Sequence, residues 1–566
     1  MKTLIQQHPV APVLYTLPKI HKHPTAPPGR PIIAARESIY YKISQYLDVF
    51  LQPVVQSQKT YLKDTISLII HLQSLPVLPS NAFLCTLDIV SLYTNIPHSG
   101  GLSAVTTLLS SSPLYTGSEL SFFIKLLELT LKRNYFLFDS RWFVQQQGCA
   151  MGSCVAPAFA NSYMFEVERQ ALFNEKEVAE KIPFFVRYID DLFLIWLGTE
   201  TEFQDLMTRV NSMDSTIKFT YCMSTQCVNY LDVQISLQEG NIHTSLFKKS
   251  TDRNTILHGS SQHPASTKKR LPFSQFLRIH CISDDINNTT KEIDIMMRQF
   301  LTRGYKLDDM MEANRKVMAI PRSETLISTK NSRKASKGDT IPFVQQYNSA
   351  SPMISKVVKN LWPVVTSDPD LKMLNKTRLL PSYTRNRNLK DWLVKNDVSA
   401  TSVGRPTTFL SRKPGCYRCT GCTTCSFMEY GDSFAHPHSG ERIAIRHILT
   451  CSSTYVVYII RCPCGLLYVG KTMRQFKEHM ALHRSSIRQA LEGGKSGTNQ
   501  PVARHFQALN HGLATLRYKI IDTVPKRLRG GDRGKALLQK EAQWIHRFNT
   551  ITTKGLNEHL PLNCFL

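Results

Sequence analysis

The stretch VRYIDDLFLIW, residues 186–196, places two adjacent aspartates, Asp190 and Asp191, between two apolar runs. Both runs are rich in β-branched and aromatic residues, a composition typical of buried strands. The carboxylates are therefore expected at the turn of a buried hairpin, where they are costly unless a cation neutralises them. A second strand-like run, within LCTLDIVSLYTNIP (84–97), ends at Asp88.

These aspartates predict a site for paired magnesium ions. Mg²⁺ prefers oxygen ligands and substrate phosphates, and two such ions can activate a primer 3′-hydroxyl and stabilise the leaving pyrophosphate. A single aspartate at the end of a strand more often caps a turn. The combination of Asp88 with Asp190, each beside apolar runs, favours the metal site.

The chain carries a large excess of positive charge. Its 566 residues include 69 Lys and Arg against 43 Asp and Glu, a formal net charge of +26. Such a surplus attracts polyanions, so we expect a nucleic-acid partner. The length predicts roughly three to five folded units. No apolar run approaches the ~18 residues of a membrane span, and the N-terminus lacks the apolar core of a signal peptide, so we expect no membrane association.

Three motifs in order resemble those of a reverse transcriptase. LDIVSLYTNIP (87–97), QQGCAMGSCVAPAFANSYM (146–164) and VRYIDDLFLIW resemble motifs A, B and C of these polymerases. More narrowly, LPKIHK (17–22) with GRPIIAARES (29–38) is similar to the Penelope-like retroelements, whose polymerase is similar to telomerase reverse transcriptase. The resemblance implies a right-hand polymerase with fingers, palm and thumb.

Two later motifs extend the resemblance to about residue 310. YLDVQI (230–235) resembles the primer grip, and KKRLPFSQFLRIHCIS (268–283) resembles the thumb. Two departures accompany them. Only 16 residues precede Leu17, so part of the fingers is expected to be missing. His280 stands where a second basic residue of the thumb is expected.

The resemblance implies a role for each matching residue. The residues that would bind Mg²⁺ are Asp88, Asp190 and, as the third acid, Asp191. Tyr93 would block a ribose 2′-hydroxyl; the alternative is an ordinary core tyrosine. Gln147 and Gly148 would line the template and the incoming nucleotide, because glycine permits close backbone approach. The candidates for binding the triphosphate, each of which could instead be a solvated surface charge, are Lys19, Lys22 and Arg30.

A row of cysteines three residues apart predicts a zinc site. These cysteines are Cys416, Cys419, Cys422 and Cys425. The C-x₂-C spacing lets two thiolates grip one tetrahedral Zn²⁺, but four in series cannot all close around one ion without strain. Two or three are therefore expected to pair with later ligands. The later candidates in range are His436, His438, His447 and Cys451. Such a site would be structural, and a linker of this kind also resembles the Penelope-like arrangement.

The distribution of cysteines indicates a reduced compartment. Of 14 cysteines, seven crowd between Cys416 and Cys464. One local metal site explains this distribution better than a disulfide framework does. Cys462 and Cys464 are interpreted as part of a tight turn between strands, with a role as metal ligands kept as the alternative.

The tail STYVVYIIRCPCGLLYVGKT (453–472) is typical of two strands around a tight turn. Tyr458, Tyr468 and Gly470 in it resemble the GIY-YIG endonucleases, with VVY where that family has GIY. The resemblance implies one divalent metal, bound by Glu541, and a tyrosine-activated water. His483 would join the two tyrosines in catalysis. The residues expected to contact or support the DNA substrate are Gly470, Lys471, Arg474, His479, His505 and Asn557.

His479 is the departure that bears on nuclease activity. Related nucleases have an arginine near this position, where a permanent cation stabilises the pentavalent phosphate, whereas histidine is mostly neutral at pH 7. Losing such a charge could cost roughly 2–4 kcal/mol of transition-state stabilisation. Arg474 or Lys471 could substitute if the geometry allows. A folded but weak or inactive nuclease is the alternative.

The sequence as a whole predicts a multidomain α+β protein with a polar linker at 328–339. The expected domains are partial fingers and palm at 1–255, a helical thumb-like region at 256–322, a connector at 323–410, a zinc-binding linker at 411–452 and the endonuclease at 453–566.

We expect an RNA-directed DNA polymerase fused to an endonuclease and acting in target-primed retrotransposition. Its partners would be an RNA template, a DNA primer or target and deoxynucleoside triphosphates. It would be made in the cytoplasm and act in the nucleus. One alternative is a degenerate copy that binds nucleic acid without chemistry. A telomerase-like cellular polymerase is a remoter alternative, because the nuclease tail argues against it.

Overall fold

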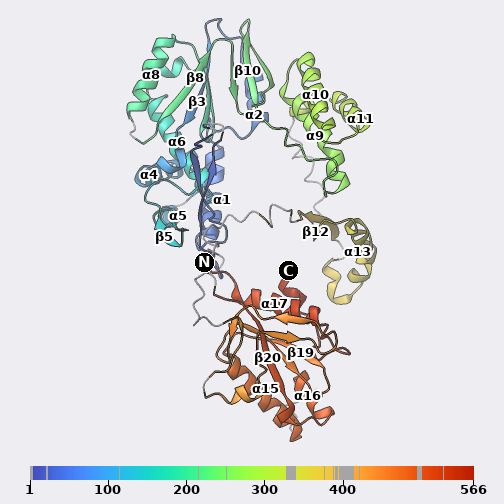
Figure 1. Ribbon diagram of the computed structural model, residues 1–566. Coiled ribbons are helices and arrows are strands. Elements are labelled where there is room, and N and C mark those ends of the chain that lie inside the picture. The colour runs from blue at the N-terminus through green and yellow to red at the C-terminus, as the bar shows by residue number, and fades with distance from the viewer. Residues whose placement is uncertain are drawn as a thin grey trace. The chain divides into compact units, whose positions relative to one another are not determined.

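The computed structural model is a mixed α/β, multidomain protein with two compact units (Figure 1). We call Val13–Ala35 with Tyr40–Val398 the N-terminal unit, and Met1–Pro12, Arg36–Ile39 and Ser399–Leu566 the C-terminal unit. The structure describes all residues except 1–3, 21–22, 24, 114, 116, 214–215, 250–251, 327–339, 375–376, 387, 389–392, 394–412, 420, 494–499, 527 and 566. The predicted linker at 328–339 lies outside the described residues.

The N-terminal unit is built on a four-stranded antiparallel sheet. Its order is β6 (Phe184–Tyr188), β7 (Asp191–Trp196), β3 (Phe83–Ile89) and β8 (Phe219–Ser224). Leu84 and Ile195 face one core, whereas Cys85 and Leu194 face another, as the two-residue period of a strand requires. A sheet buried on both faces explains why its central strands are almost wholly apolar.

Helices cover one face of this sheet and form the larger core (Figure 1). They are α1 (Tyr41–Gln56), α4 (His98–Ser110), α5 (Gly117–Lys132), α6 (Ala156–Ala171) and α8 (Glu200–Met213). The short helices α3 (Leu92–Asn95) and α7 (Lys176–Glu180) connect them to the strands. Two hairpins, β1 (Leu14–Pro18) with β2 (Gly29–Ile33) and β4 (Tyr135–Phe138) with β5 (Arg141–Val144), complete this part of the unit.

The other face of the sheet packs on a second core. It contains α2 (Thr65–Gln73), the strands β9 (Cys227–Tyr230), β10 (Val233–Gln238) and β11 (Asn241–Leu246), and the helices α9 (Ala265–Ile282), α10 (Ile286–Leu301), α11 (Leu307–Met318) and α12 (Arg322–Leu326). The helical region predicted at 256–322 contains α9, α10 and α11, which begin at Ala265. His280 is 8% exposed, and its Nε2 lies 2.9 Å from the Ile320 carbonyl, so it ties α9 to the chain after α11.

A parallel strand pair and one helix follow. β12 (Thr340–Gln346) pairs in parallel with β13 (Arg378–Thr384), and α13 (Ser351–Thr366) with the 3₁₀ turn Pro369–Leu374 connects them. A parallel pair needs such a crossover, since a tight turn can join only antiparallel strands.

The C-terminal unit has a three-stranded antiparallel sheet in the order β19 (Leu467–Thr472), β18 (Val456–Arg461) and β20 (Arg517–Thr523). The helices α15 (Phe476–Leu491), α16 (Pro501–Ala508) and α17 (Arg533–Phe548) surround it (Figure 1). Small pairs precede it, namely β14 (Gly415–Cys416) with β17 (Ile448–Leu449) and β15 (Ser433–Ala435) with β16 (Arg442–Ala444).

The cysteine-rich segment shares its core with the tail. Cys425, Met428 and Cys451 lie in one apolar cluster with Tyr458 and Ile460 of β18. Arg484 of α15 donates to the Thr424 hydroxyl at 3.0 Å, which adds a polar link between the two segments. The predicted boundary between residues 452 and 453 therefore falls inside one packed unit. Among the described residues, no helix is both long and apolar enough to span a membrane.

Gly101→Ala tests the packing of α4 on α6. A Cβ at Gly101 would lie 2.2 Å from Cζ of Phe159, whose side chain is fully buried. We expect a loss of about 1–3 kcal/mol of unfolding free energy from overpacking, although alanine favours helix. The control is Gly117→Ala, where no heavy atom lies within 4 Å of the added Cβ. Thermal denaturation should lower Tm for the first variant alone; equal Tm values would contradict this packing.

Candidate functional site

The three aspartates of the N-terminal unit meet at the end of the central sheet. Asp88 of β3 is the register partner of Asp191 on β7, and Asp190 lies in the turn between β6 and β7. They open into a cavity of about 900 Å³. Lys19 and Arg30 also line this cavity, so cationic side chains face the carboxylates across it.

The electrostatics of this cluster favour a bound cation. Burial raises the pKa of Asp191 to about 6, and repulsion by Asp190 and Asp88 adds to the rise. Burial likewise raises the pKa of Asp190, with Asp88 adding to the rise while Arg30 and Lys19 oppose it. Crowded carboxylates of this kind gain most from divalent cations, and oxygen ligands suit Mg²⁺.

A buried ion pair supports the turn that carries the aspartates. Arg187, which precedes the turn on β6, is 1% exposed and donates to Glu168 and to the side chain of Asn161. Its Nη1 also lies 3.4 Å from the Ile189 carbonyl. Ile189 has φ of 59°, a conformation that β-branched residues rarely adopt. Thr60 donates to Glu168 at 2.8 Å, which completes the network.

Tyr230 braces the same turn from its other side. The Tyr188 amide donates to the Tyr230 hydroxyl at 3.2 Å, and that hydroxyl donates to the Asp191 carbonyl at 3.0 Å. Sequence reasoning missed Arg187, Glu168 and Tyr230 as positioning residues. The available sign was a charged arginine inside an otherwise apolar strand, which requires a buried partner.

The other predicted polymerase residues divide into two groups. Tyr93 lines the cavity, and burial raises its pKa, so its hydroxyl stays protonated. Gln147 and Gly148 are not among the residues that line the cavity. Gln147 donates to the Asn95 carbonyl at 2.8 Å, and a Cβ at Gly148 would lie 2.3 Å from the Tyr93 carbonyl oxygen. The close approach at this glycine is thus to Tyr93. Lys22 lies outside the described residues.

The C-terminal unit gathers a second group of predicted residues around β18 and α15. Tyr458 is 1% exposed, and its hydroxyl lies 2.9 Å from Nε2 of His483. The His479 and His483 rings are 5.2 Å apart, and the Tyr468 and His483 rings 6.0 Å. Burial lowers the pKa of His483 to about 3, with His479 adding to the shift, and burial also raises the pKa of Tyr458, so both side chains are neutral at pH 7.

Glu541 of α17 is a metal-ligand candidate near the same tyrosines. Burial raises its pKa to about 7, while Lys471 opposes the rise by its charge and by a backbone hydrogen bond. Burial lowers the pKa of His479, and Arg474 and Lys471 add to this shift. His479 is therefore a neutral group at pH 7, and the permanent positive charges near it belong to Arg474 and Lys471.

Gly470 and Asn557 act on the geometry of the strands. Tyr458 is the register partner of Gly470, and a Cβ at Gly470 would lie 2.5 Å from the Tyr458 hydroxyl. Asn557 is 6% exposed and clamps β19: its Oδ1 accepts from the Val469 amide at 2.9 Å, and its Nδ2 donates to the Val469 carbonyl at 2.8 Å. The supporting role expected for Asn557 is thus a structural one in this structure.

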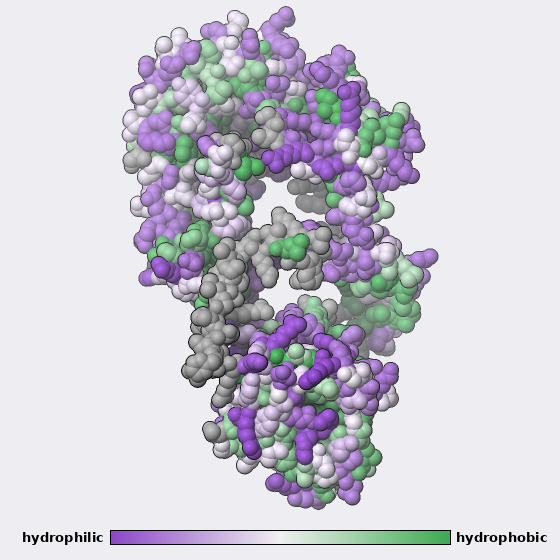
Figure 2. All heavy atoms as spheres, viewed as in Figure 1, coloured by the Kyte–Doolittle hydropathy of each residue, from purple (hydrophilic) through white to green (hydrophobic). Residues whose placement is uncertain are grey.

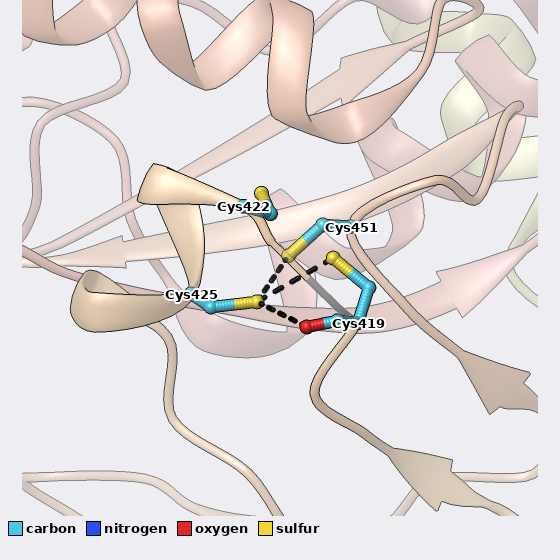
Figure 3. Close-up of side chains that lie close together, drawn as sticks. All are labelled: Cys419, Cys422, Cys425 and Cys451. Carbon is cyan, nitrogen blue, oxygen red and sulfur yellow. Dashed lines mark hydrogen bonds between the residues drawn. The ribbon is translucent and has the colours of Figure 1, made fainter.

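A four-cysteine cluster fits a structural zinc site (Figure 3). Its thiols, which all lie within 4.8 Å of one another, belong to Cys419, Cys422, Cys425 and Cys451. The Sγ of Cys425 is 3.5 Å from that of Cys419 and 3.4 Å from that of Cys451. These distances are close to the edge of roughly 3.8 Å that a ZnS₄ tetrahedron requires. As expected, three members of the row pair with a later cysteine.

The prediction that Cys416, the first cysteine of the row, is a zinc ligand needs a correction. Cys416 is fully buried, belongs to β14 and is not part of the cluster. Its backbone is held by the Gly431 carbonyl, which accepts from the Cys416 amide at 2.9 Å. The histidines considered as ligands are also outside the cluster: His447 lies 3.8 Å from Asp522, and His436 contacts the Phe548 carbonyl at 3.3 Å.

A second possible metal cluster contains His505, which is expected from the sequence among the DNA-binding residues. Nε2 of His505 lies 3.1 Å from Sγ of Cys462 and 3.2 Å from Sγ of Cys464, and His511 completes the group. Nε2 of His511 is buried without a hydrogen-bond partner, as an unfilled metal ligand would be. His505 therefore does not join the tyrosines, and the Cys462–Cys464 turn can also bind zinc.

The comparisons with known proteins give one short family match. A model described as the animal helix-turn-helix domain matches residues 255–316, which hold α9, α10 and most of α11. No curated protein matches the chain.

Solved polymerases are similar to the chain at low identity. The telomerase of Candida albicans with a fragment of telomeric RNA matches with a TM-score of 0.39 and 8% identity. The match covers 65% of this chain and 66% of the telomerase chain. The apo telomerase of Candida tropicalis has a TM-score of 0.34 and 12% identity, covering 56% and 61%. The RNA-dependent RNA polymerase of a human picobirnavirus has a TM-score of 0.37 and 14% identity, covering 57% and 65%. The chain spans less than two thirds of the length of each.

Metal analysis of the purified protein should find two zinc ions per chain. Cys425→Ser should lose one ion, and His505→Ala should lose the other, because each removes a ligand from a different cluster. Cys416→Ala is the matched control from the same segment, and it should keep both ions. Loss of zinc from Cys416→Ala, or none from His505→Ala, would contradict these ligand sets.

Proposed function

We propose that the chain is an RNA-dependent DNA polymerase fused to a GIY-YIG-type endonuclease. The observation that carries the polymerase half is the convergence of Asp88, Asp190 and Asp191 on a cavity of about 900 Å³ with Lys19 and Arg30. Buried carboxylates facing cations suit a triphosphate that arrives with magnesium. The order of the matching motifs along the chain adds support.

The residues that line the cavity would have different roles in nucleotide addition. The three aspartates would hold Mg²⁺, which when bound supplies charge neutralisation for the primer hydroxyl and the pyrophosphate. Lys19 and Arg30 orient the triphosphate opposite the carboxylates. Tyr93, in the wall of the cavity, excludes a ribose 2′-hydroxyl and so selects deoxynucleotides.

The thumb is the role we propose for the helices α9, α10 and α11. They follow the β9–β10–β11 sheet in the chain, as a thumb follows a primer grip, and α9 carries the exposed cations Lys269 and Arg270. Cations on a helix surface suit the phosphates of a duplex. The helix-turn-helix match to this region is compatible with contact to a duplex.

The nuclease half is supported by the group around Tyr458. Tyr458, Tyr468 and neutral His483 share one buried contact network, and Glu541 would hold one divalent metal. When bound, the metal would polarise a water molecule and the scissile phosphate of the DNA. His483 would orient the Tyr458 hydroxyl through their 2.9 Å contact, and Lys471 and Arg474 would neutralise the phosphate.

Together the two halves suit target-primed copying. A nick made by the C-terminal unit supplies a 3′-hydroxyl on DNA, and the N-terminal unit extends it along an RNA template with deoxynucleoside triphosphates. On this proposal both steps act on chromosomal DNA, in the nucleus. A degenerate copy that binds nucleic acid without chemistry is the second candidate, and neutral His479 is the observation that favours it for the nuclease.

Asp190→Asn should abolish primer extension on an RNA template with Mg²⁺. The substitution removes one charge from the carboxylate cluster while keeping its size, so at least a hundredfold loss of rate is expected from metal-dependent catalysis of this kind. Asp205→Asn, on the surface of α8, is the matched control. No extension by the wild-type chain itself, at the level of the Asp190 variant, would refute the polymerase.

His479→Arg should raise the rate of DNA nicking. A permanent cation would replace a neutral ring, and a gain of about 2–4 kcal/mol corresponds to roughly 30- to 1000-fold. Glu541→Gln should abolish nicking in both backgrounds. Equal nicking rates for wild type and His479→Arg would mean that Lys471 and Arg474 already supply the charge.

A further inference from the structure

The β4–β5 hairpin of the N-terminal unit exposes aromatic side chains to solvent. The exposed fraction is 49% for Phe138, 57% for Trp142 and 43% for Phe143. Large apolar side chains gathered on one short element usually mark a binding surface. Green, hydrophobic surface lies where β5 is labelled in Figure 1 (Figure 2).

The strand register sorts these residues onto two faces. Phe136 is opposite Phe143, and Phe138 is opposite Arg141, so these four side chains share one face. On the other face Leu137 is 6% exposed, whereas Trp142 opposite it is 57% exposed, so that face is buried only in part. We call Phe136, Phe138, Phe143 and Arg141 the phenylalanine face.

The rings of the phenylalanine face are arranged as a row. The Phe136 and Phe143 centroids are 5.9 Å apart with ring planes at 19°, and the Phe138 and Phe143 centroids are 6.4 Å apart at 62°. The turn residues Asp139 and Ser140 both have positive φ, 47° and 61°, as in a tight hairpin turn that holds its strands in register.

The charge around this face suits a polyanion. Between residues 133 and 148 the charged residues are Arg133, Arg141 and a single acid, Asp139, and the whole chain carries +26. Aromatic rings beside cations are the combination that binds unpaired nucleic-acid strands, because bases stack on the rings while the cations neutralise the backbone.

The hairpin is also continuous with the wall of the aspartate cavity. Asn134 donates to the Gln145 side chain at 2.8 Å, and Gln145 in turn donates to the Gln147 carbonyl at 2.9 Å. Gln147 donates to the Asn95 carbonyl, and Thr94 beside it lines the cavity. A nucleic-acid strand bound to the phenylalanine face would therefore be separated from the cavity only by the short segment that contains Gln145 and Gln147.

We propose that the phenylalanine face binds the unpaired template strand by base stacking as that strand approaches the cavity. This inference rests on the proposed polymerase function and names the part of the substrate that the hairpin receives. A protein partner would use the same apolar area, but it would not need flat rings. The stacking geometry and the positive charge favour the nucleic acid.

Binding measurements with the full chain can test this proposal separately from catalysis. Fluorescence anisotropy, without nucleotides or divalent metal, would compare a DNA primer on an RNA template carrying a ten-nucleotide 5′ extension with the same duplex made blunt. Phe138→Leu/Phe143→Leu keeps apolar side chains but removes two stacking rings. We expect roughly tenfold weaker binding of the extended duplex and no change for the blunt one.

Two further comparisons isolate the cause. Phe122→Leu, at a phenylalanine of α5 that is 41% exposed, is the matched control and should bind both duplexes like wild type. An extension made of abasic units should bind wild type as weakly as the natural extension binds the double variant. Arg141→Gln should lower the salt dependence of extended-duplex binding by a slope of about 1.

The outcomes separate this inference from the polymerase itself. Wild-type affinity of the double variant for the extended duplex would overturn the proposal and leave a protein as the partner of this face. Equal losses for extended and blunt duplexes in a variant with wild-type Tm would also overturn it. Primer extension by the wild-type chain decides the polymerase independently, since the binding assay needs no chemistry.

Discussion

The buried pair between Arg187 and Glu168 is the interaction on which the aspartate cavity depends. Both side chains are almost fully buried, at 1% and 2% exposure, and leaving either charge alone would cost about 3–5 kcal/mol. The pair joins β6 to α6, and through Arg187 it reaches the carbonyl of strained Ile189. A backbone in that conformation persists only where its surroundings over-determine it. The positions of Asp190 and Asp191 in the cavity thus depend on the buried charges of Arg187 and Glu168.

The sequence predicts the parts of both sites that follow local rules. Two strand-like runs ending in acids predict that Asp88 and Asp190 meet, and both residues line the same cavity. The C-x₂-C row predicts a zinc cluster with a later cysteine, and Cys451 is that residue. The helical region predicted at 256–322 likewise contains α9, α10 and α11. In each case a short periodic pattern carries the information.

What the sequence does not predict depends on contacts between distant segments. Arg187 and Glu168 belong to different elements, and no periodicity links a residue of β6 to one of α6. His505 was expected beside the tyrosines because it is a histidine in the predicted nuclease tail, yet its Nε2 lies close to the thiols of Cys462 and Cys464. Cys416 has the same spacing as its neighbours but is diverted into β14 by pairing with β17. Tertiary packing decides these three positions.

The two cysteine clusters have a consequence for how long the C-terminal unit survives in a cell. One joins Cys425 to Cys451 and the other joins Cys462 to His505, so each bound ion would close a loop of 26 or 43 residues. Closing such loops restricts the unfolded chain, as a disulfide does, but a metal staple is reversible and responds to free metal concentration. Because the first cluster lies in the core that also contains Tyr458, zinc supply would govern the turnover of the C-terminal unit as well as its shape.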